Sequence, residues 1–313
     1  MDEGPLTVSP RVALLLATFN GAAHLEAQLA SLAAQTVPPA WLIVGDDGST
    51  DGTRDLLAAF DHAHPGIGLR LVEGPRKGAA MNFLSLLAHV PEGADMIGFC
   101  DQDDVWLPEK TARACAALGR AEGPMLYCAA TWVCDEALAH PRLSRSPTCA
   151  MGFRHALVQN VAGGNTMMLN RAAADLLIRA ARGVGALVVH DWWAYQVVSG
   201  AGGHVVFDPE PCLLYRQHGR NQIGANDGTR ARLRRIAMLL GGHFRDWNSV
   251  NLKALHVARP LLTVDSRQAL DGFEALRRAP LSRRLRLLRQ AGLYRQDLAG
   301  NASLWVAAIL GRM

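Results

Sequence analysis

The sequence predicts an α/β fold, with a mostly parallel sheet flanked by helices and a basic helical region at the C-terminal end. Three observations support this prediction. Short apolar runs alternate with stretches of helical spacing through roughly the first 120 residues. Polar motifs directly follow several of these runs, at the strand ends where such sheets bind ligands. From about Ala225 the strand signals stop and arginine becomes frequent.

Strands are predicted where apolar residues run continuously, which is typical of strands covered on both faces. In chain order, these strands occupy residues 11–19, 41–47, 68–74 and 96–100. Between and after them, helical spacing predicts helices at residues 22–35, 53–63, 82–90 and 108–119. The last helix has Pro108 near its first turn and Gly119 at its end, as helices often do.

The composition predicts a cytoplasmic protein. A hydrophobic content of 50% in 313 residues is enough for a substantial core in one or two domains. The opening stretch MDEGPLTVSPR is acidic and polar, so no signal peptide is expected. No apolar run approaches the ~20 residues that span a bilayer. Six cysteines occur without a CxxC pair, and several lie in apolar runs, which favours reduced thiols.

The charge is unevenly distributed along the chain. Residues 1–224 hold 16 Lys and Arg against 22 Asp and Glu, whereas residues 225–313 hold 16 against 6. We therefore expect a catalytic domain over 1–224 and a basic C-terminal region over 225–313, with helices at 230–240 and 281–290.

Two interpretations of the basic region stay open. It is either a solvated helical face or a contact with an anionic membrane surface, at the inner face of the cell membrane. Nucleic acid is not an expected partner, because the body is acidic and no helix-turn-helix, zinc or stacking signature occurs.

Three carboxylates within four residues follow the apolar run MIGFC, in the stretch DQDDVW. One of them can cap the helix that starts near Pro108, and Asp104 is the expected cap. Asp101 and Asp103 have the alternating spacing that aims both into one cleft at a strand end, where unpaired they would repel each other. A hard divalent cation, Mn²⁺ or Mg²⁺, that also takes phosphate oxygens accounts for the group.

A second polar stretch, DDGSTDGT, follows the second predicted strand. It also suits an ordinary turn into a helix, and this interpretation stays open. An EF-hand is excluded because Ala58 stands where the twelfth position requires glutamate. No GxGxxG and no GxxxxGK[ST] occurs, so phosphate is handled without a glycine cradle. The functional interpretation is that Asp46 or Asp47 accepts hydrogen bonds from a nucleobase or ribose.

The chain contains, in this order, the motifs LLATFNGAAHLEAQLASLAAQT, DDGSTDGT, DQDDVWLPEK, GGNTMMLNR, HDWW and YRQHGRN. Together they resemble family 2 glycosyltransferases of the GT-A fold, and within that family the bacterial rhamnosyltransferase-like group that builds surface polysaccharides such as the O-antigen of lipopolysaccharide. The resemblance covers roughly residues 10–225. It implies a nucleotide-diphosphate sugar donor, with dTDP-rhamnose expected and UDP- and GDP-sugars open, and a saccharide or lipid-linked saccharide acceptor.

The resemblance implies nucleotide-binding roles for residues after the first four predicted strands. These residues are Thr18, Asn20, Asp46 or Asp47, Arg76 or Lys77, Asn82 and Asp101. The segment GPRKGAAMNF would close over the nucleotide, and Asp101 would lie near the ribose. This segment has arginine where the group often has asparagine, so the side chain that meets the nucleobase stays open.

The resemblance also assigns the metal and the chemistry. Asp103 would bind the metal with His218 as a further contact, although a polar loop histidine is an open alternative. Arg216 would contact the diphosphate, which suits the geometry of guanidinium. Asp191 in HDWW matches the general base of the family, and His190 stands where an acid is often found.

Elementary chemistry supports some of these roles. Asp191 precedes two tryptophans, and partial desolvation there would raise its pKa toward that of a useful base; a helix N-cap is compatible with this role. Trp192 would stack on an acceptor sugar unless it packs in the core. The backbone N–H groups of Gly163, Gly164 and Asn165 would serve the diphosphate or acceptor, with plain turn glycines as the alternative.

The predicted function is a metal-dependent inverting glycosyltransferase. A nucleotidylyltransferase would need a glycine-rich, lysine-bearing loop after the first strand, and ATFNGAAHL has no basic residue except histidine. A non-catalytic nucleotide-sugar-binding module would not require Asp191 in addition to Asp103.

Overall fold

The computed structural model describes residues 10–119, 121–218 and 241–313. Its main sheet has seven strands in the order β10-β6-β9-β4-β1-β2-β3, and β9 runs antiparallel to both neighbours while the other pairs are parallel. The strands are β1 (Val12–Thr18), β2 (Trp41–Asp46), β3 (Gly68–Glu73), β4 (Met96–Cys100), β6 (Met125–Ala129), β9 (Met168–Asn170) and β10 (His204–Asp208). The predicted mostly parallel sheet is confirmed, as are its first four strands.

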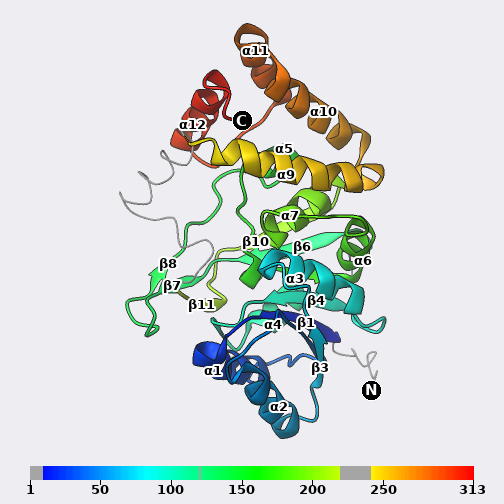
Figure 1. Cartoon of the computed structure of the whole chain (residues 1–313), viewed down its shortest axis with the longest axis vertical. Helices are drawn as coiled ribbons and strands as arrows, with labels where there is room; N and C mark the ends of the chain where they lie inside the picture. The colour runs from blue at the N-terminus through cyan, green and yellow to red at the C-terminus, as the bar shows by residue number, and fades with distance from the viewer. Residues whose placement is uncertain (1–9, 120, 219–240) are drawn as a thin grey trace, which may run out of the picture.

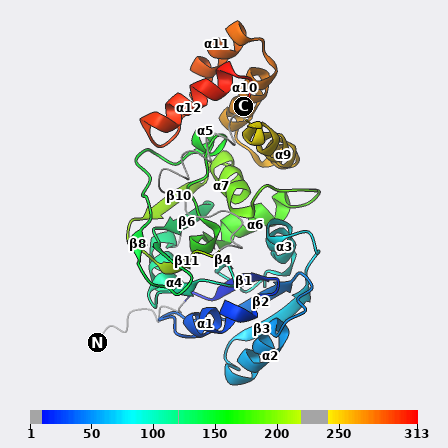
Figure 2. The same ribbon diagram turned by 60° about the vertical axis from the view of Figure 1, so that its left-hand side comes forward.

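Helices cover both faces of the sheet (Figures 1 and 2). Alternate residues of β1 explain this: Leu14 and Leu16 pack with α1, α2 and α4, whereas Ala13 and Leu15 pack with α3, α6 and α7. The helical elements of this part are α1 (Ala22–Ala33), α2 (Thr53–Ala63), α3 (Ala79–Leu86), η1 (Leu87–His89), α4 (Lys110–Leu118), α5 (Phe153–Ala156), η2 (Gly164–Thr166), α6 (Arg171–Ala180) and α7 (His190–Gly200). The four predicted helices are present with ends shifted by up to about three residues.

A second, four-stranded sheet lies beside the first, in the order β5-β11-β7-β8. Its strands are β5 (Val105–Trp106), β11 (Leu213–Arg216), β7 (Trp132–Cys134) and β8 (Arg142–Leu143). β5 follows DQDD and pairs antiparallel with β11, so that Val105 lies opposite Leu214. This pairing brings the segment after β11 to the acidic loop.

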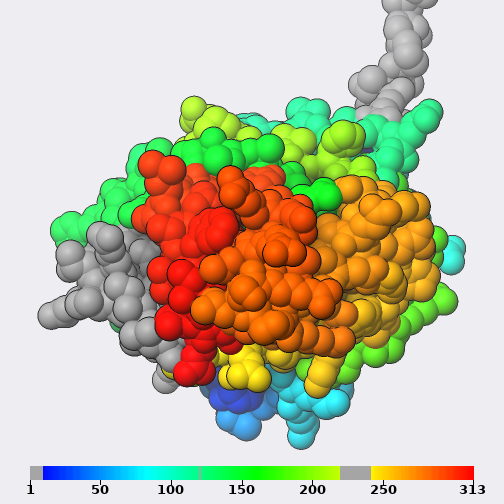
Figure 3. Space-filling view, turned by 90° about the horizontal axis from the view of Figure 1, so that it is seen from above, coloured from blue at the N-terminus to red at the C-terminus, as the bar shows by residue number. Residues whose placement is uncertain are grey.

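The C-terminal helices form the end of the molecule opposite α2 (Figure 1). They are α9 (His243–Ala258), η3 (Arg259–Leu261), α10 (Val264–Arg278), α11 (Leu281–Ala291) and α12 (Leu298–Ile309). Leu252 and Leu255 of α9 belong to the same buried cluster as α7, so these helices share a core with one face of the sheet. Figure 3 shows α10, α11 and α12 side by side on this end.

The helix predicted at 281–290 is confirmed by α11, and the one predicted at 230–240 lies outside the described residues. No helix in the described parts of the chain is long and apolar enough to cross a membrane. Five of the six cysteines are buried and Cys149 is exposed, with no disulfide among the described residues.

Candidate active site

Three polar loops meet at the carboxyl ends of β1, β2 and β4. β1 pairs with β2 on one side and β4 on the other, with Thr18 opposite Asp46 and Leu16 opposite Cys100. The loops TFNG, DDGSTDGT and DQDDVW therefore start next to one another, as the ligand edge of a parallel sheet requires.

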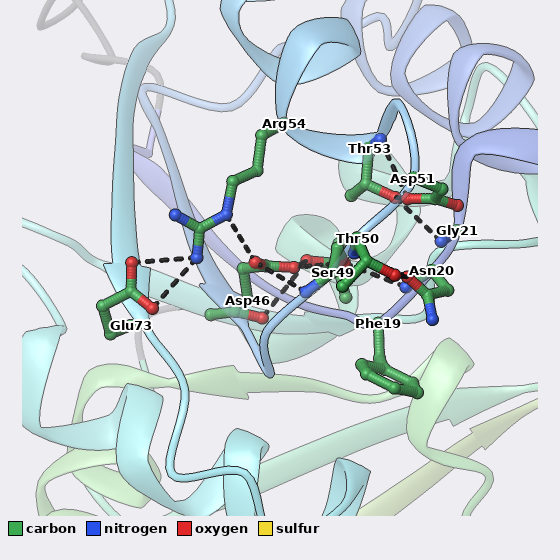
Figure 4. Close-up of polar contacts among 12 residues, drawn as sticks. Phe19, Asn20, Gly21, Asp46, Ser49, Thr50, Asp51, Thr53, Arg54 and Glu73 are labelled. Atoms are coloured by element: carbon green, nitrogen blue, oxygen red, sulfur yellow. Dashed lines mark hydrogen bonds and ion pairs between the residues drawn. The ribbon is translucent and has the colours of Figure 1, made fainter.

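Asp46 organises the loop after β2 (Figure 4). Its side chain has no exposed surface, and it accepts hydrogen bonds from Thr18 Oγ1 (3.1 Å), Ser49 N (3.1 Å), Ser49 Oγ (2.5 Å) and Arg54 Nε (2.7 Å). Burial alone would raise its pKa, but the bonds from Ser49 and Arg54 outweigh burial and hold the pKa below its usual value. Four bonds use the lone pairs of a carboxylate, so direct contact of Asp46 with a nucleotide is not supported.

Thr18 is also buried, and its hydroxyl donates to Asp46 rather than facing the cleft. Asn20 has a positive φ of 48° and accepts a hydrogen bond from Thr50 N at 2.8 Å. It thereby joins the loop after β1 to the loop after β2 (Figure 4). Both residues predicted to hold base and ribose thus stabilise the loops of the cleft.

Asp47 is the acid of the DDG stretch that keeps bonding capacity. Its two oxygens accept hydrogen bonds from Arg76 N and Gly78 N, each at 2.9 Å, which leaves lone pairs for a ligand. These bonds hold the loop GPRKG over the end of β2. Arg76 has a φ of 55°, and its exposed side chain extends over Gly48.

Asn82 does not reach the cleft. It is 1% exposed, and its amide donates to Gly45 O at 2.7 Å. A Cβ at Gly45 would stand 2.1 Å from Asn82 Oδ1, so the glycine permits this close approach of α3 to β2. The predicted nucleotide contact of Asn82 is not supported, because the side chain serves packing beneath the loop.

Burial and neighbouring negative charge act on two carboxylates of DQDDVW, Asp101 and Asp104. Burial, followed by the charges of Asp103, Asp104 and Asp191, raises the pKa of Asp101 well above its usual value. Burial and the charge of Asp103 raise the pKa of Asp104 to about 7. The charged forms of Asp101 and Asp104 are therefore disfavoured, and a bound cation would relieve the repulsion.

Asp103 and His218, the two predicted metal contacts, are brought together by the pairing of β5 with β11. His218 Nε2 lies 2.7 Å from Asp103 Oδ2, and both side chains keep some exposed surface. Within the described residues, no group of three or more His, Cys, Asp or Glu side chains is arranged to hold a metal. A hard cation such as Mg²⁺ is often held by one or two carboxylates together with substrate phosphates. The donor set fits a cation whose remaining ligands come with the nucleotide.

Asp104 is not the helix cap that the sequence predicts. In this part of the described chain α4 starts at Lys110 without a side-chain cap, and Asp104 is buried. Its carboxylate accepts hydrogen bonds from Asn165 Nδ2 (2.7 Å) and Arg216 N (3.3 Å). Asp104 therefore bonds to η2 and β11, which are distant in sequence, and does not bond to the N-terminus of the nearby α4.

Lys110 is fully buried behind this acid cluster. Its ammonium group donates to Asn165 O and lies 3.0 Å from the centroid of the Trp106 ring. Burial lowers the pKa of Lys110 to about 8, although Asp104 and other neighbouring groups act to raise it. Asn165 is therefore held at its side-chain amide by Asp104 and at its backbone carbonyl by Lys110.

Asp191 lies in the first turn of α7, whose N-cap is Val189. Its carboxylate accepts hydrogen bonds from Gly164 N (2.9 Å) and Trp192 N (2.5 Å). Burial raises its pKa to about 6 even though these bonds act in the opposite direction. The predicted N-cap is wrong by two positions, whereas the predicted direction of the pKa shift agrees.

His190 stacks on Phe83 with ring centroids 3.9 Å apart, and burial lowers its pKa to about 3. It is therefore neutral and does not replace the acid that the family often has at this position. A Cβ at Gly164 would stand 2.6 Å from His190 Nε2, so only glycine allows His190 to pack this closely against the backbone of η2. Gly163 precedes η2 and accepts from Thr166.

Two further residues with predicted contacts, Trp192 and Arg216, are buried. Trp192 is 5% exposed, and its indole N–H donates to Ala156 O at 2.6 Å, which leaves no face for an acceptor sugar. Arg216 is likewise buried; its Nε donates to Asp103 O at 3.0 Å and its Nη1 to Glu136 O. Arg216 therefore stabilises the backbone of the acidic loop at Asp103.

Phe19 was missed by the sequence reasoning. It is 56% exposed in the loop after β1 (Figure 4). Its backbone exchanges hydrogen bonds with Gln102 at 2.9 and 3.2 Å. An aromatic residue within a polar loop directly after a strand was the available signal. Lys110 had no such signal, because its burial depends on Asn165 and Trp106 together.

The family model described as Glycosyl transferase family 2 matches residues 14–174. A dTDP-rhamnosyl transferase, RfbG of Shigella flexneri, is 26% identical over 254 residues, which is 74% of this chain and 81% of that protein. A putative teichuronic acid biosynthesis glycosyltransferase, TuaG of Bacillus subtilis strain 168, is 23% identical over 52% of this chain and 63% of its own length.

Two solved structures share the fold. The first is TarS 1-349 of S. aureus in complex with UDP-GlcNAc, with a TM-score of 0.54 and 13% identity over 96% of this chain and 90% of that chain. The second is the mannosyltransferase PcManGT of Pyrobaculum calidifontis in complex with GDP-Man and Mn²⁺, with a TM-score of 0.50 and 18% identity over 98% and 86%. At these identities the likeness concerns the fold alone.

Proposed function

The chain belongs to glycosyl transferase family 2, and we propose that it moves a sugar from a nucleotide diphosphate to an acceptor hydroxyl with inversion at the anomeric carbon. One observation carries the proposal. Asp191, a carboxylate with a pKa raised to about 6, accepts a hydrogen bond from Gly164 N at 2.9 Å, and the next residue, Asn165, donates to Asp104 of the acidic loop at 2.7 Å. A base and a donor site thus share one cleft.

Asp191 is the proposed general base. With a pKa of about 6 it is ionised at neutral pH and still basic enough to take a proton from a hydroxyl in the transition state. The N–H groups of Gly164 and Trp192 fix the orientation of its carboxylate. As Asp191 takes its proton, the acceptor hydroxyl oxygen bonds to the anomeric carbon on one face, while the bond to the diphosphate oxygen breaks on the other; this single displacement inverts the anomeric centre.

Asp103 and His218 would hold Mn²⁺ or Mg²⁺. The proposed nucleotide site is lined by Asp47, Asp101, Arg76 and Phe19. When bound, the cation supplies positive charge to the diphosphate. Asp47 keeps lone pairs for base or ribose hydroxyls, and the exposed ring of Phe19 offers a stacking surface. The partial exposure of Asp103 and His218 leaves room for phosphate oxygens.

The proposed donor is dTDP-rhamnose, and the proposed acceptor is a saccharide or lipid-linked saccharide of a bacterial surface polysaccharide. The dTDP-rhamnosyl transferase activity for which the RfbG relative is named supports the donor, and the teichuronic acid relative supports polysaccharide synthesis in general. We further propose that the enzyme works in the cytoplasm at the inner face of the membrane, without a nucleic-acid partner. The excess of arginine in residues 225–313 supports an anionic surface as a partner.

A thermal-shift panel tests the donor. Melting is followed with dTDP-rhamnose, UDP- and GDP-sugars, each with and without Mn²⁺. A ligand stabilises the folded state in proportion to the logarithm of its excess over Kd, so the donor should give the largest shift, and only with the metal. Equal shifts for all nucleotides, or shifts independent of Mn²⁺, would contradict the assignment. Release of nucleoside diphosphate in the same samples distinguishes transfer from binding alone.

A further inference from the structure

α12 is an apolar helix whose outer face is uncovered. The sequence LAGNASLWVAAI contains no charged residue. Leu298 is 90% exposed and Ile309 is 50% exposed, and Trp305 lies between them on the same helical face. Val306 and Leu310 extend this exposed apolar stripe. A helix that is apolar all round is normally covered on every side.

The inner face of α12 is already in use. Leu304, Ala307 and Ala308 are buried against the neighbouring helices. Arg284 of α11 donates to Ala308 O at 2.9 Å, which ties the two helices together. The outward stripe is therefore held in a fixed orientation, and it remains unpartnered within the described residues.

The chain around α12 is rich in arginine. Residues 279–313 contain six arginines and one acidic residue, Asp297. Arg283, Arg286 and Arg289 lie on the exposed side of α11, and no ion pair to them occurs within the described ranges. Figure 3 shows α11 (dark orange) and α12 (red) next to each other on one face of the molecule.

We propose that this face of α11 and α12 docks on an anionic lipid surface, with the α12 stripe lying in the headgroup region. A helix of 12 residues is about 18 Å long, so it lies along a bilayer instead of crossing it. Trp305 is an aromatic residue of the kind that occupies membrane interfaces, and guanidinium groups meet lipid phosphates. Apolar insertion by α12 and electrostatic attraction by the neighbouring α11 would act together.

A second copy of the chain fits this face less well. A symmetric dimer through the stripe would bring the arginines of both copies toward one another. Like charges at an interface oppose association, whereas an anionic surface attracts them. The charge of the face therefore favours lipid over self-association.

Co-sedimentation with vesicles tests the proposal without any sugar donor, so its result is independent of glycosyl transfer. The full chain is mixed with vesicles of phosphatidylcholine, or of phosphatidylcholine with phosphatidylglycerol. The Leu298→Ser/Ile309→Ser variant removes exposed apolar side chains, and Arg283→Gln/Arg286→Gln removes charge. Leu143→Ser, at a leucine of β8 that is 48% exposed, close to the 50% of Ile309, is the control, and melting curves verify folding.

Wild type and Leu143→Ser should bind the phosphatidylglycerol vesicles much more tightly than phosphatidylcholine alone. The Leu298→Ser/Ile309→Ser variant should bind at least about tenfold more weakly, and each lost arginine should weaken binding roughly fivefold. Absence of wild-type binding, or equal binding by the stripe variant, would overturn the proposal. So would a dimer in solution that the stripe variant abolishes, because a second copy would then occupy the stripe.

Discussion

Asp191 combines two opposing influences at one carboxylate. Backbone N–H groups from Gly164 and Trp192 favour its charged form, while burial favours the protonated form and raises the pKa to about 6. The unfolded chain has a pKa near 3.8. Between these values the unfolded state loses its proton first, so ionisation of Asp191 lowers the stability of the fold as pH rises through this window.

The Asp191→Asn variant should therefore lose less stability than wild type between pH 4 and pH 7. The pKa of Asp191 differs by about two units between the folded and unfolded chain, which corresponds to about 3 kcal/mol of stability lost by wild type. Asparagine does not ionise, and its side-chain oxygen can still accept the hydrogen bond from Gly164 N. Urea unfolding at several pH values measures this. Parallel stability curves for the two proteins would show that Asp191 is not the buried, destabilised acid described here.

The buried Lys110 stabilises η2 and the acidic loop of the site. Its ammonium group satisfies Asn165 O and offsets the charges of Asp101 and Asp104. Lys110→Met should lower the free energy of unfolding by about 1–3 kcal/mol, because a buried acceptor loses its donor. Lys253→Met, at an exposed position of α9, should leave it almost unchanged. Equal stability of the two variants, measured by urea unfolding, would argue against this role.

At the scale of elements, η2 connects the acidic loop to the base. Its Asn165 is held by Asp104 and Lys110, and its Gly164 donates to Asp191. A displacement of η2 would therefore move Asp191 relative to the donor site. Short elements of this kind fix active-site geometry through their backbone.

Gly164→Ala tests this connection. The added Cβ would stand 2.6 Å from His190 Nε2 and 3.2 Å from Asp191 Cβ, so one of them must move. A misplacement of about 1 Å can cost 10²-fold in rate, and we expect a loss of kcat/KM of that order. Gly185→Ala, whose Cβ would meet nothing within 4 Å, should keep the wild-type kcat/KM. A steady-state assay of nucleotide release compares them, and a fully active Gly164→Ala would refute the connection.

The sequence predicted the first four strands because burial on both faces demands continuous apolar residues. It did not predict β5 or β11, since pairs of two to four residues carry no periodicity. It identified the loops of the site but not which side chain faces the cleft. Asp46 and Asp47 are neighbours of the same type, and their hydrogen-bond partners distinguish them: Asp46 accepts from Ser49 and Arg54, and Asp47 from the backbone of the later loop GPRKG. Asp104 was misassigned for the same reason, because Asn165 lies far away in sequence.

At the scale of the whole molecule, the C-terminal helices are packed onto the catalytic part. Leu255 of α9 is fully buried in the cluster that includes α7, the helix that carries Asp191. The division expected at residue 224/225 therefore separates regions of different charge that share a core. α9 supports the base indirectly by covering α7.

Leu255→Ala should destabilise the whole chain by about 2–5 kcal/mol, because it opens a cavity in the shared core. Val257→Ala, at a partly exposed residue two positions away, should cost much less. Urea unfolding followed by both far-UV circular dichroism and tryptophan fluorescence should show one transition shifted to lower urea. Two separate transitions, with only one of them shifted, would show that the C-terminal region folds independently.

The most direct test of the account is single-turnover release of nucleoside diphosphate by Asp191→Asn in the presence of donor, acceptor and Mn²⁺. A positioned base contributes about 10²–10⁴-fold, so the variant should be slower by that factor while its donor Kd stays close to the wild-type value. Turnover at the wild-type rate, with the variant folded and the donor bound, would contradict the assignment of Asp191 as the base.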